Sequence, residues 1–242
     1  MKIALITGVS RKEGIGFETA RQLGLKQYKV VLSARQLAKA KALSEELTAL
    51  GLDADAVEID ITNDTSVISA ARELEKKYGK IDVLINNAGM MVHSAATVAD
   101  KDLAELSREL ETNVTGTWRV TQAIFPLLVK SKNARVVNIS SSMGSITEPG
   151  WGLLDYNRSP IPAYSITKLA LNGLTIKMAK EFKDHHILVN AVCPGFTATY
   201  PGMEKMGARP VNESVEGIVW AATLDDDGPT GQFFRDRKIV AW

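Results

Sequence analysis

The sequence YSITK, residues 164–168, places a phenol and an amine at a spacing that suits proton transfer. On a helix, Tyr164 and Lys168 lie on one face, with about 5–6 Å between their Cβ atoms. A phenol has an ordinary pKa of about 10 and is a poor proton shuttle at neutral pH. A neighbouring ammonium group favours the phenolate and lowers that pKa towards the working range. The alternative is an aromatic ring packed on a lysine stem, because YxxxK is a common pattern.

The segment TGVSRKEGIG, residues 7–16, has the composition of a phosphate-binding loop. Glycines let the backbone approach a phosphate closely, and the N-terminus of a following helix offers free N–H groups. No Gly-Lys-Ser/Thr follows, so the segment is not a P-loop. Gly8 and Gly14 stand further apart than the usual dinucleotide fingerprint allows, and we expect the longer loop to bulge outward over a pyrophosphate. An ordinary tight turn is the alternative.

The residue that follows the second apolar run distinguishes NADP from NAD. NAD sites place an Asp or Glu about 20 residues beyond the loop, where it binds the ribose 2′-hydroxyl. This sequence has no acidic residue between Glu18 and Glu45. Arg35 stands there instead, where a guanidinium can pair with a 2′-phosphate. The sequence therefore favours NADP(H) over NAD(H), with a solvated helix start at Arg35 as the alternative.

Alternating patterns predict the elements that position these groups. Short β-branched runs, typical of strands buried on both faces of a parallel sheet, occupy 3–7, 29–33, 55–59, 82–86, 135–140 and 187–192. Segments with helical spacing occupy 15–27, 36–50, 63–78, 100–131, 163–184 and 212–224. Such regular alternation predicts right-handed βαβ units and an α/β fold, a single-domain Rossmann-type doubly wound parallel sheet flanked by helices.

Small or polar residues follow each of the six predicted strands. They are Gly8, Arg35, Asp60, 87–89, 141–143 and 193–195. The carboxyl ends of parallel strands meet at one edge of the sheet, and ligands bind there where the strand order reverses. We expect the chemistry along that edge. No linker or repeat divides the chain, so residues 1–242 are predicted to form one domain.

Composition and charge exclude several classes of protein. The 242-residue chain has a formal net charge of +1, so no overall field draws it to nucleic acid or to an anionic membrane. Cys193 is the single cysteine, which excludes an intrachain disulfide and a zinc cluster. His93, His185 and His186 lack metal-ligand spacing, so no metal is expected. The sequence lacks GxSxG, which counts against a hydrolase.

The N-terminus carries no signal-peptide pattern, because a short apolar run leads directly to Gly8. No apolar run approaches the ~18 residues that a membrane-spanning helix needs. These features predict a soluble, cytoplasmic domain.

Six motifs, in this order, resemble the short-chain dehydrogenase/reductase family over almost the whole chain. They are TGVSRKEGIG, NNAG (86–89), ETNVTG (111–116), VVNISSS (136–142), YSITK and CPGFTAT (193–199). The segment VVLSAR (30–35) and the tail GPTGQFFRDRKIVAW (228–242) are similar to its carbonyl-reductase branch. The resemblance implies an NADPH-dependent oxidoreductase that reduces a ketone or aldehyde, a small-molecule carbonyl substrate, by hydride transfer.

The resemblance implies catalytic roles at matching positions. Tyr164 would be the proton donor, and Lys168 would lower its pKa and hold the nicotinamide ribose. Asn113 would position a water relay behind the lysine. For the serine that binds the substrate oxygen, alignment on VVNIS-S points to Ser141, and its two neighbours, Ser140 and Ser142, are the alternatives.

The resemblance also implies where a cofactor and a substrate bind. The implied cofactor residues, besides Tyr164 and Lys168, are Gly8, Ser10, Arg11, Gly14, Ile15, Gly16, Arg35, Asp60, Ile61, Asn87, Ala88, Gly89, Pro194, Gly195, Thr197 and Thr199. The candidate substrate contacts are His93, Ser142, Trp151 and Phe196. These assignments divide the domain into a cofactor-binding part, about 1–140, and a catalytic and substrate part, about 141–242.

Three alternatives stay open at this point. The lengthened glycine loop also occurs in enoyl reductases, but those enzymes usually hold six residues between Tyr and Lys, and Ile161 occupies that tyrosine's place. A non-catalytic NADP-binding sensor or scaffold on the same fold commonly loses the Tyr or the Lys. The family default is a homodimer or homotetramer, although carbonyl-reductase relatives include monomers.

Overall fold

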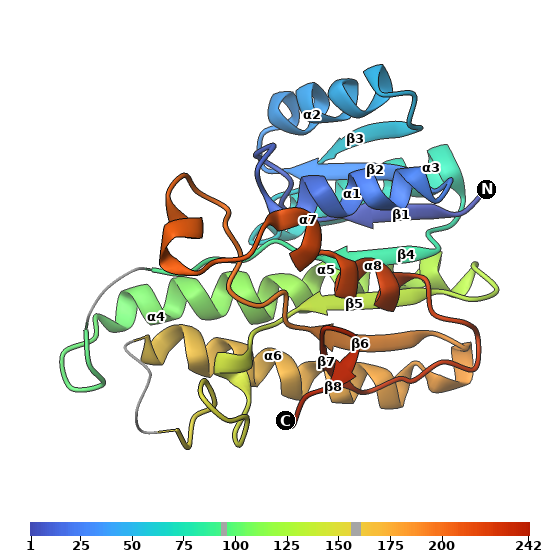
Figure 1. The fold of residues 1–242 in the computed structure, drawn as a ribbon. Helices are drawn as coiled ribbons and strands as arrows, with labels where there is room; N and C mark the ends of the chain where they lie inside the picture. The colour runs from blue at the N-terminus through green and yellow to red at the C-terminus, as the bar shows by residue number, and fades with distance from the viewer. Residues whose placement is uncertain (93–95, 156–160) are drawn as a thin grey trace.

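The computed structural model describes residues 1–92, 96–155 and 161–242, and its centre is one eight-stranded sheet (Figure 1). The strand order is β3-β2-β1-β4-β5-β6-β7-β8. Neighbours from β3 through β7 pair in parallel, and β8 pairs antiparallel with β7. The strands are β1 (Ile3–Ile6), β2 (Lys29–Ala34), β3 (Ala54–Glu58), β4 (Val83–Asn86), β5 (Arg135–Ile139), β6 (Leu188–Val192), β7 (Phe233–Arg235) and β8 (Lys238–Ile239).

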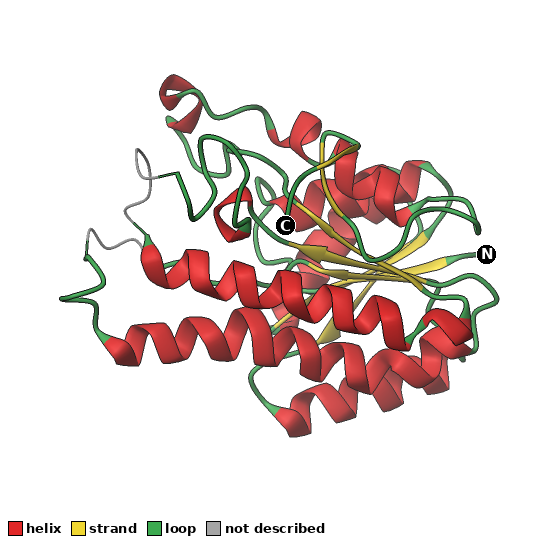
Figure 2. Cartoon of the chain, turned by 90° about the horizontal axis from the view of Figure 1, so that it is seen from below, coloured by secondary structure: helices red, strands yellow, loops and turns green. Residues whose placement is uncertain are grey.

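Helices cover both faces of the sheet (Figure 2). The main helices are α1 (Ile15–Leu25), α2 (Leu37–Ala49), α3 (Asp64–Tyr78), α4 (Leu103–Leu110), α5 (Thr117–Val129), α6 (Pro162–Glu181), α7 (Val211–Ser214) and α8 (Glu216–Ala222). One apolar core packs α1, α2 and α8 on one face, and a second packs α3, α5 and α6 on the other. The shorter turns are η1 (Glu111–Gly116), η2 (Ser142–Gly144), η3 (Lys183–His185) and η4 (Met203–Met206).

The predicted doubly wound parallel sheet is confirmed. Strands β1, β4, β5 and β6 are buried along their whole length, as expected for strands covered by helices on both faces. The chain first builds outward from β1 to β3 and then returns to β4 on the other side of β1. The strand order therefore reverses between β1 and β4, and the cleft of the sheet opens there.

Two predicted helices are divided in the structure. Segment 100–131 is not one helix, because the π-helical turn η1 separates α4 from α5. An inserted residue of this kind is often found at functional sites. Segment 212–224 likewise divides into α7 and α8.

The antiparallel hairpin of β7 and β8 was not among the six predicted strands. It lies at the β6 edge of the sheet, and Trp242 stacks on Phe233 with 5.7 Å between ring centroids. The hairpin is too short for an alternating pattern to mark it.

In the described ranges, no helix combines the length and the apolar character that crossing a lipid bilayer demands.

Candidate active site

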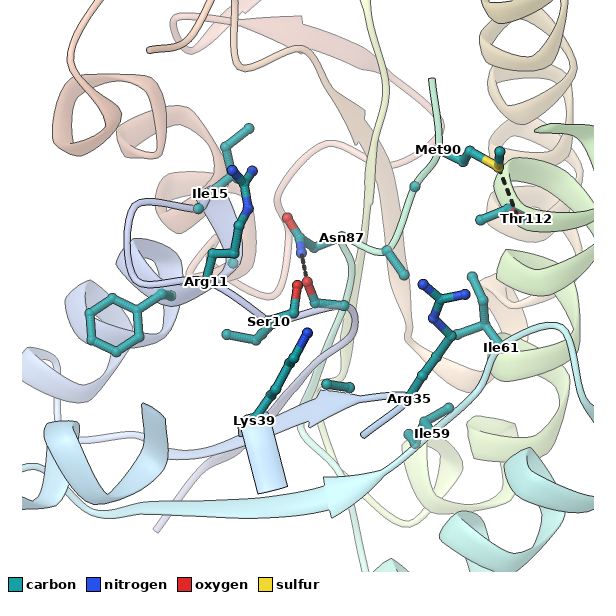
Figure 3. Close-up of a pocket in the computed structure, with 18 of the residues that line it drawn as sticks. Ser10, Arg11, Ile15, Arg35, Lys39, Ile59, Ile61, Asn87, Met90 and Thr112 are labelled. Atoms are coloured by element: carbon teal, nitrogen blue, oxygen red, sulfur yellow. Dashed lines mark hydrogen bonds between the residues drawn. The ribbon is translucent and has the colours of Figure 1, made fainter. Parts of the chain in front are cut away.

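A cavity of about 990 Å³ opens where the strand order reverses, at the carboxyl ends of β1 to β4 (Figure 3). The loop between β1 and α1 forms one wall. The residues that follow β2, β3 and β4 form the others. The cavity therefore lies at the edge where the sequence predicts a ligand.

The glycine loop packs directly against the segment after β4. Gly8 has a φ of 71°, and a Cβ there would lie 2.6 Å from Ala88 Cα. A Cβ on Gly16 would lie 2.6 Å from Asn87 Nδ2. Thr7 Oγ1 accepts hydrogen bonds from the backbone N–H groups of Asn87 and Ala88, each at 3.0 Å. Only glycine allows this close approach, so the two segments form a single rigid cradle.

The additional residues of the glycine loop reach across to the segment after β6. Arg11 Nη1 donates to the Thr199 carbonyl oxygen at 3.2 Å, and its guanidinium lies 3.9 Å from the centroid of the Tyr200 ring. Lys12 forms an ion pair with Glu46 on α2. The loop thus holds the 199–200 segment at the cavity wall through Arg11.

Two cations, Arg35 and Lys39, line the cavity near its β2 side (Figure 3). Neither forms a salt bridge with another residue in the described part of the chain. The nearest acid in the lining, Asp60, accepts hydrogen bonds from Thr62 N–H at 3.0 Å and from Thr62 Oγ1 at 2.7 Å. Burial works against its ionisation, but Thr62, Arg35 and Arg119 outweigh burial and lower the pKa of Asp60. The two cations can therefore serve a dianionic group.

Tyr164 and Lys168 lie on α6, near the carboxyl end of β5. Lys168 Nζ donates to the Ile139 carbonyl oxygen at 2.8 Å and lies 5.4 Å from the centroid of the Tyr164 ring. Burial lowers the pKa of Lys168 to about 8, and burial raises the pKa of Tyr164. The lowered phenol pKa expected from the sequence is therefore wrong for this arrangement. Burial is the largest cause of this rise in the pKa of Tyr164.

Two of the three candidate serines are engaged elsewhere. Ser140 Oγ donates to Asn172 Oδ1 at 2.5 Å. Ser142 is buried, and its Oγ donates to Cys193 Sγ at 3.4 Å. Both hydroxyls therefore already have protein partners. The candidate role of Ser142 as a substrate contact stays a prediction.

Ser141 faces the tyrosine. Its hydroxyl interacts with that of Tyr164, which lowers the tyrosine pKa and opposes part of the effect of burial. Ser141 Oγ also accepts from the Met143 backbone N–H at 3.2 Å, which fixes the side chain at the start of η2. Two hydroxyls that converge in this way can both donate to one substrate oxygen.

Asn113 connects the helices to the cavity from the π-helical turn. Its Oδ1 accepts from the Met90 N–H at 2.7 Å, and its Nδ2 donates to the Met90 carbonyl at 2.8 Å and to Thr167 Oγ1 at 3.0 Å. A Cβ on Gly89 would lie 3.5 Å from Asn113 Oδ1 and 3.8 Å from Lys168 Nζ. Gly89 and Met90 line the cavity, so Asn113 and Lys168 lie directly behind its wall.

Glu109 is a buried carboxylate that the sequence did not mark as functional. Its Oε1 accepts from the Val92 N–H at 2.7 Å, and its Oε2 has no hydrogen-bond partner among the described residues. Its negative charge adds to the rise in the pKa of Tyr164. Only its position, one helical turn before Asn113, offered a signal.

Most of the predicted cofactor residues line the cavity. They are Gly8, Ser10, Arg11, Gly14, Ile15, Gly16, Arg35, Asp60, Ile61, Asn87, Ala88, Gly89 and Thr199. Sequence reasoning missed Lys39, although it stands four residues after Arg35 on a predicted helix. It also missed the lining residues Gln36, Thr62, Met90, Thr112 and Tyr200.

Other predicted residues lie outside the cavity lining. Pro194 accepts from Arg209 Nε at 2.9 Å, and Thr197 Oγ1 donates to the Gly195 carbonyl at 3.2 Å. Trp151 and Phe196 are partly exposed and do not line the cavity either. His93 falls outside the described residues.

Comparisons with known proteins agree with this geometry. A family model described as short chain dehydrogenase matches residues 2–208. The chain is 31% identical to carbonyl reductase [NADPH] 1 of Bos taurus over 278 aligned positions, which cover 99% of this chain and 98% of that protein. It is 34% identical to a 3-oxoacyl-[acyl-carrier-protein] reductase of Synechocystis over 211 positions, which cover 87% of this chain and 79% of that protein.

A solved structure has nearly the same backbone. It is the NADPH-bound carbonyl reductase from chicken fatty liver, with a TM-score of 0.85, 26% sequence identity and complete coverage of both chains.

Proposed function

This chain belongs to the short-chain dehydrogenase family, and we propose that it is an NADPH-dependent reductase of ketones or aldehydes. Members of the family are NAD(P)-dependent oxidoreductases that act on small molecules. One observation carries the proposal for this chain. Lys168 lies beside the Tyr164 ring and reaches Gly89 in the wall of the cavity. Arg35 and Lys39 line the same cavity, and neither forms a salt bridge with another described residue.

The residues present fit a nicotinamide cofactor. Gly8 and Gly16 let the glycine loop pack closely on the 87–89 segment at the wall of the cavity, and the N-terminus of α1 that follows offers backbone N–H groups for a pyrophosphate. Arg35 and Lys39 would bind a 2′-phosphate, which favours NADP(H) over NAD(H). When bound, this cofactor supplies the hydride that reaches the carbonyl carbon.

The chain's own residues would handle the proton and the developing charge. Tyr164 donates its proton to the substrate oxygen while Ser141 donates a hydrogen bond to the same oxygen. A raised pKa suits this direction of reaction, because it keeps Tyr164 protonated at neutral pH. With a pKa of about 8, Lys168 is mostly charged at neutral pH and would hold the nicotinamide ribose.

Two further roles follow from the same arrangement. Asn113, which is fixed on Met90 and Thr167, would position the water relay behind Lys168. Residues up to about 140 would hold the cofactor, and those from 141 onward would bind substrate, with Trp151 and Phe196 as its apolar contacts.

The test is a panel of ketones and aldehydes mixed with NADPH or NADH at equal concentration, followed by the loss of cofactor absorbance. We expect turnover of at least one carbonyl, faster with NADPH, and its loss in Tyr164→Phe. Activity on activated C=C bonds with none on carbonyls would identify an enoyl reductase instead. Tight NADPH binding without any turnover would identify the non-catalytic sensor.

A further inference from the structure

Arg235, at the end of β7, joins three parts of the chain through one side chain. Its Nη1 donates to Ser142 Oγ at 2.8 Å, and its Nη2 lies 2.6 Å from Glu148 Oε1. Ser142 directly follows Ser141. Glu148 belongs to the segment between Ser141 and Tyr164.

Burial makes this arrangement costly to disrupt. The Glu148 side chain is only 6% exposed, and its Oε2 has no hydrogen-bond partner among the described residues. A buried carboxylate needs a nearby cation, and Arg235 is the cation that the structure pairs with it. Arg235 therefore has a fixed place, which a guanidinium forked between two acceptors holds better than an ammonium group would.

Ser142 also forms hydrogen bonds with Cys193, which directly follows β6. Its N–H and its hydroxyl both donate to Cys193 Sγ, at 3.3 Å and 3.4 Å. The Gly144 N–H donates to the Ser141 carbonyl at 2.8 Å and closes the turn. Because the guanidinium, the thiol and the turn hold Ser142 from three sides, the preceding Ser141 has little freedom to rotate.

The C-terminal hairpin is tied to the same segment at a second point. Ser145 Oγ donates to the Ala241 carbonyl at 2.7 Å and accepts from the Glu148 N–H at 2.9 Å. Arg235 and Ala241 therefore contact the residues between Ser141 and Tyr164 at Ser142, Ser145 and Glu148.

We propose that Arg235 is a positioning residue for carbonyl reduction, which acts by holding Ser142 and Glu148 so that the Ser141 hydroxyl stays directed at Tyr164. This inference rests on the proposed function. Arg235 does not line the cavity, and its side chain contacts Ser142 and Glu148. Its removal should therefore slow the chemical step and leave cofactor binding unchanged.

The test compares Arg235→Met with Arg237→Met in the intact chain. Arg237 lies on the same hairpin, but its pair with Glu216 is exposed and 3.2 Å long. We expect Arg235→Met to lower kcat for the best carbonyl substrate by about 10- to 100-fold, the range for a displaced catalytic group, with KM for NADPH unchanged. Arg237→Met should match the wild-type protein in both constants.

Arg235→Lys keeps a positive charge beside Glu148, so it provides the test if the Arg235→Met variant fails to fold. A lysine reaches one acceptor in place of two, so an intermediate kcat is expected. In the Ser141→Ala background, Arg235→Met should cause no additional loss of kcat, because the group that it positions is already gone. A further loss of similar size in that background would overturn the proposal.

The outcomes separate this inference from the proposed function. If the wild-type chain reduces carbonyls and Tyr164→Phe does not, the function stands. Unchanged kcat in both Arg235→Lys and Arg235→Met would then overturn the positioning role alone. If the wild-type chain reduces no carbonyl with NADPH, the function fails and the inference fails with it.

Discussion

The two halves of the sheet edge hold their charged groups in opposite ways. In the cavity, Arg35 and Lys39 extend into open space without a salt bridge to another described residue (Figure 3). Around the tyrosine, Lys168 and Asn113 are each fixed on backbone groups, and Arg235 is fixed on two side chains.

This difference assigns a different task to each half. Cations without a salt-bridge partner can pair with an anion that a ligand brings, so under the proposed function the cavity half would set the affinity for the cofactor and the choice between NADP(H) and NAD(H). Groups that the protein already orients need no reorganisation during reaction, so under the proposed function the tyrosine half would set the rate of the chemical step. Substitutions in the first half should change KM, and substitutions in the second should change kcat.

The largest effect is expected for Tyr164→Phe. Removal of the hydroxyl removes the proton donor and leaves the ring in place, so kcat should fall by about 10²- to 10⁴-fold. The affinity for NADPH, measured by fluorescence titration, should stay within twofold. If Tyr164→Phe keeps more than half of the wild-type kcat, the proposal that the tyrosine half sets the rate is wrong.

Arg35→Ala and Lys39→Ala test the cavity half. Each removes a charged contact to the 2′-phosphate, so each should raise KM for NADPH by about 10- to 100-fold, with kcat and KM for NADH unchanged. Lys41→Ala is the matched control, because Lys41 lies on the same helix and does not line the cavity. Equal losses with both cofactors would show that the two cations do not recognise a 2′-phosphate.

The pH dependence of reduction sharpens the comparison further. Burial lowers the pKa of Lys168 to about 8, so its positive charge is lost as the pH rises through that value. Above that pH, the fraction of the protein with a protonated Lys168 falls about tenfold per pH unit. We expect kcat/KM for the carbonyl to fall in the same proportion, because only the charged form of Lys168 would support the reaction. A profile measured from pH 6 to 10 checks this, and a flat profile up to pH 10 would contradict it.

The smallest effect is expected for Arg11→Ala. The contacts of Arg11 with Thr199 and Tyr200 close one wall of the cavity, and a partly exposed cation–π contact contributes about 0.5–1 kcal/mol. The release rate of NADPH, measured by stopped-flow displacement, should therefore rise by about two- to fivefold. Lys12→Ala is the control, since that side chain pairs with Glu46, and it should release NADPH at the wild-type rate.

Patterns of local origin made much of this fold predictable. The strands β1 to β6 follow from short β-branched runs, and the edge follows from the residues after them. Tyr164 and Lys168 share a helix, so their proximity is a matter of spacing alone. Lys39 was equally accessible to this reasoning, four residues beyond Arg35.

Long-range contacts and burial were not predictable in this way. Arg235 and Ser142 are 93 residues apart, and no local pattern links them. The direction of the pKa of Tyr164 depends on how much water the fold removes, which spacing does not reveal. Among three consecutive serines, spacing alone could not show that Ser140 and Ser142 are engaged by Asn172 and Cys193.

The π-helical turn at Glu111–Gly116 sets a limit on changes in the length of the chain. An α-helix turns by about 100° per residue, so deletion of one residue there would merge α4 and α5 into a regular helix and rotate one against the other by that angle. Asn113 would then swing away from Met90, and Glu109 would swing away from Val92. A single lost codon in this turn would therefore be far more damaging than most substitutions in it.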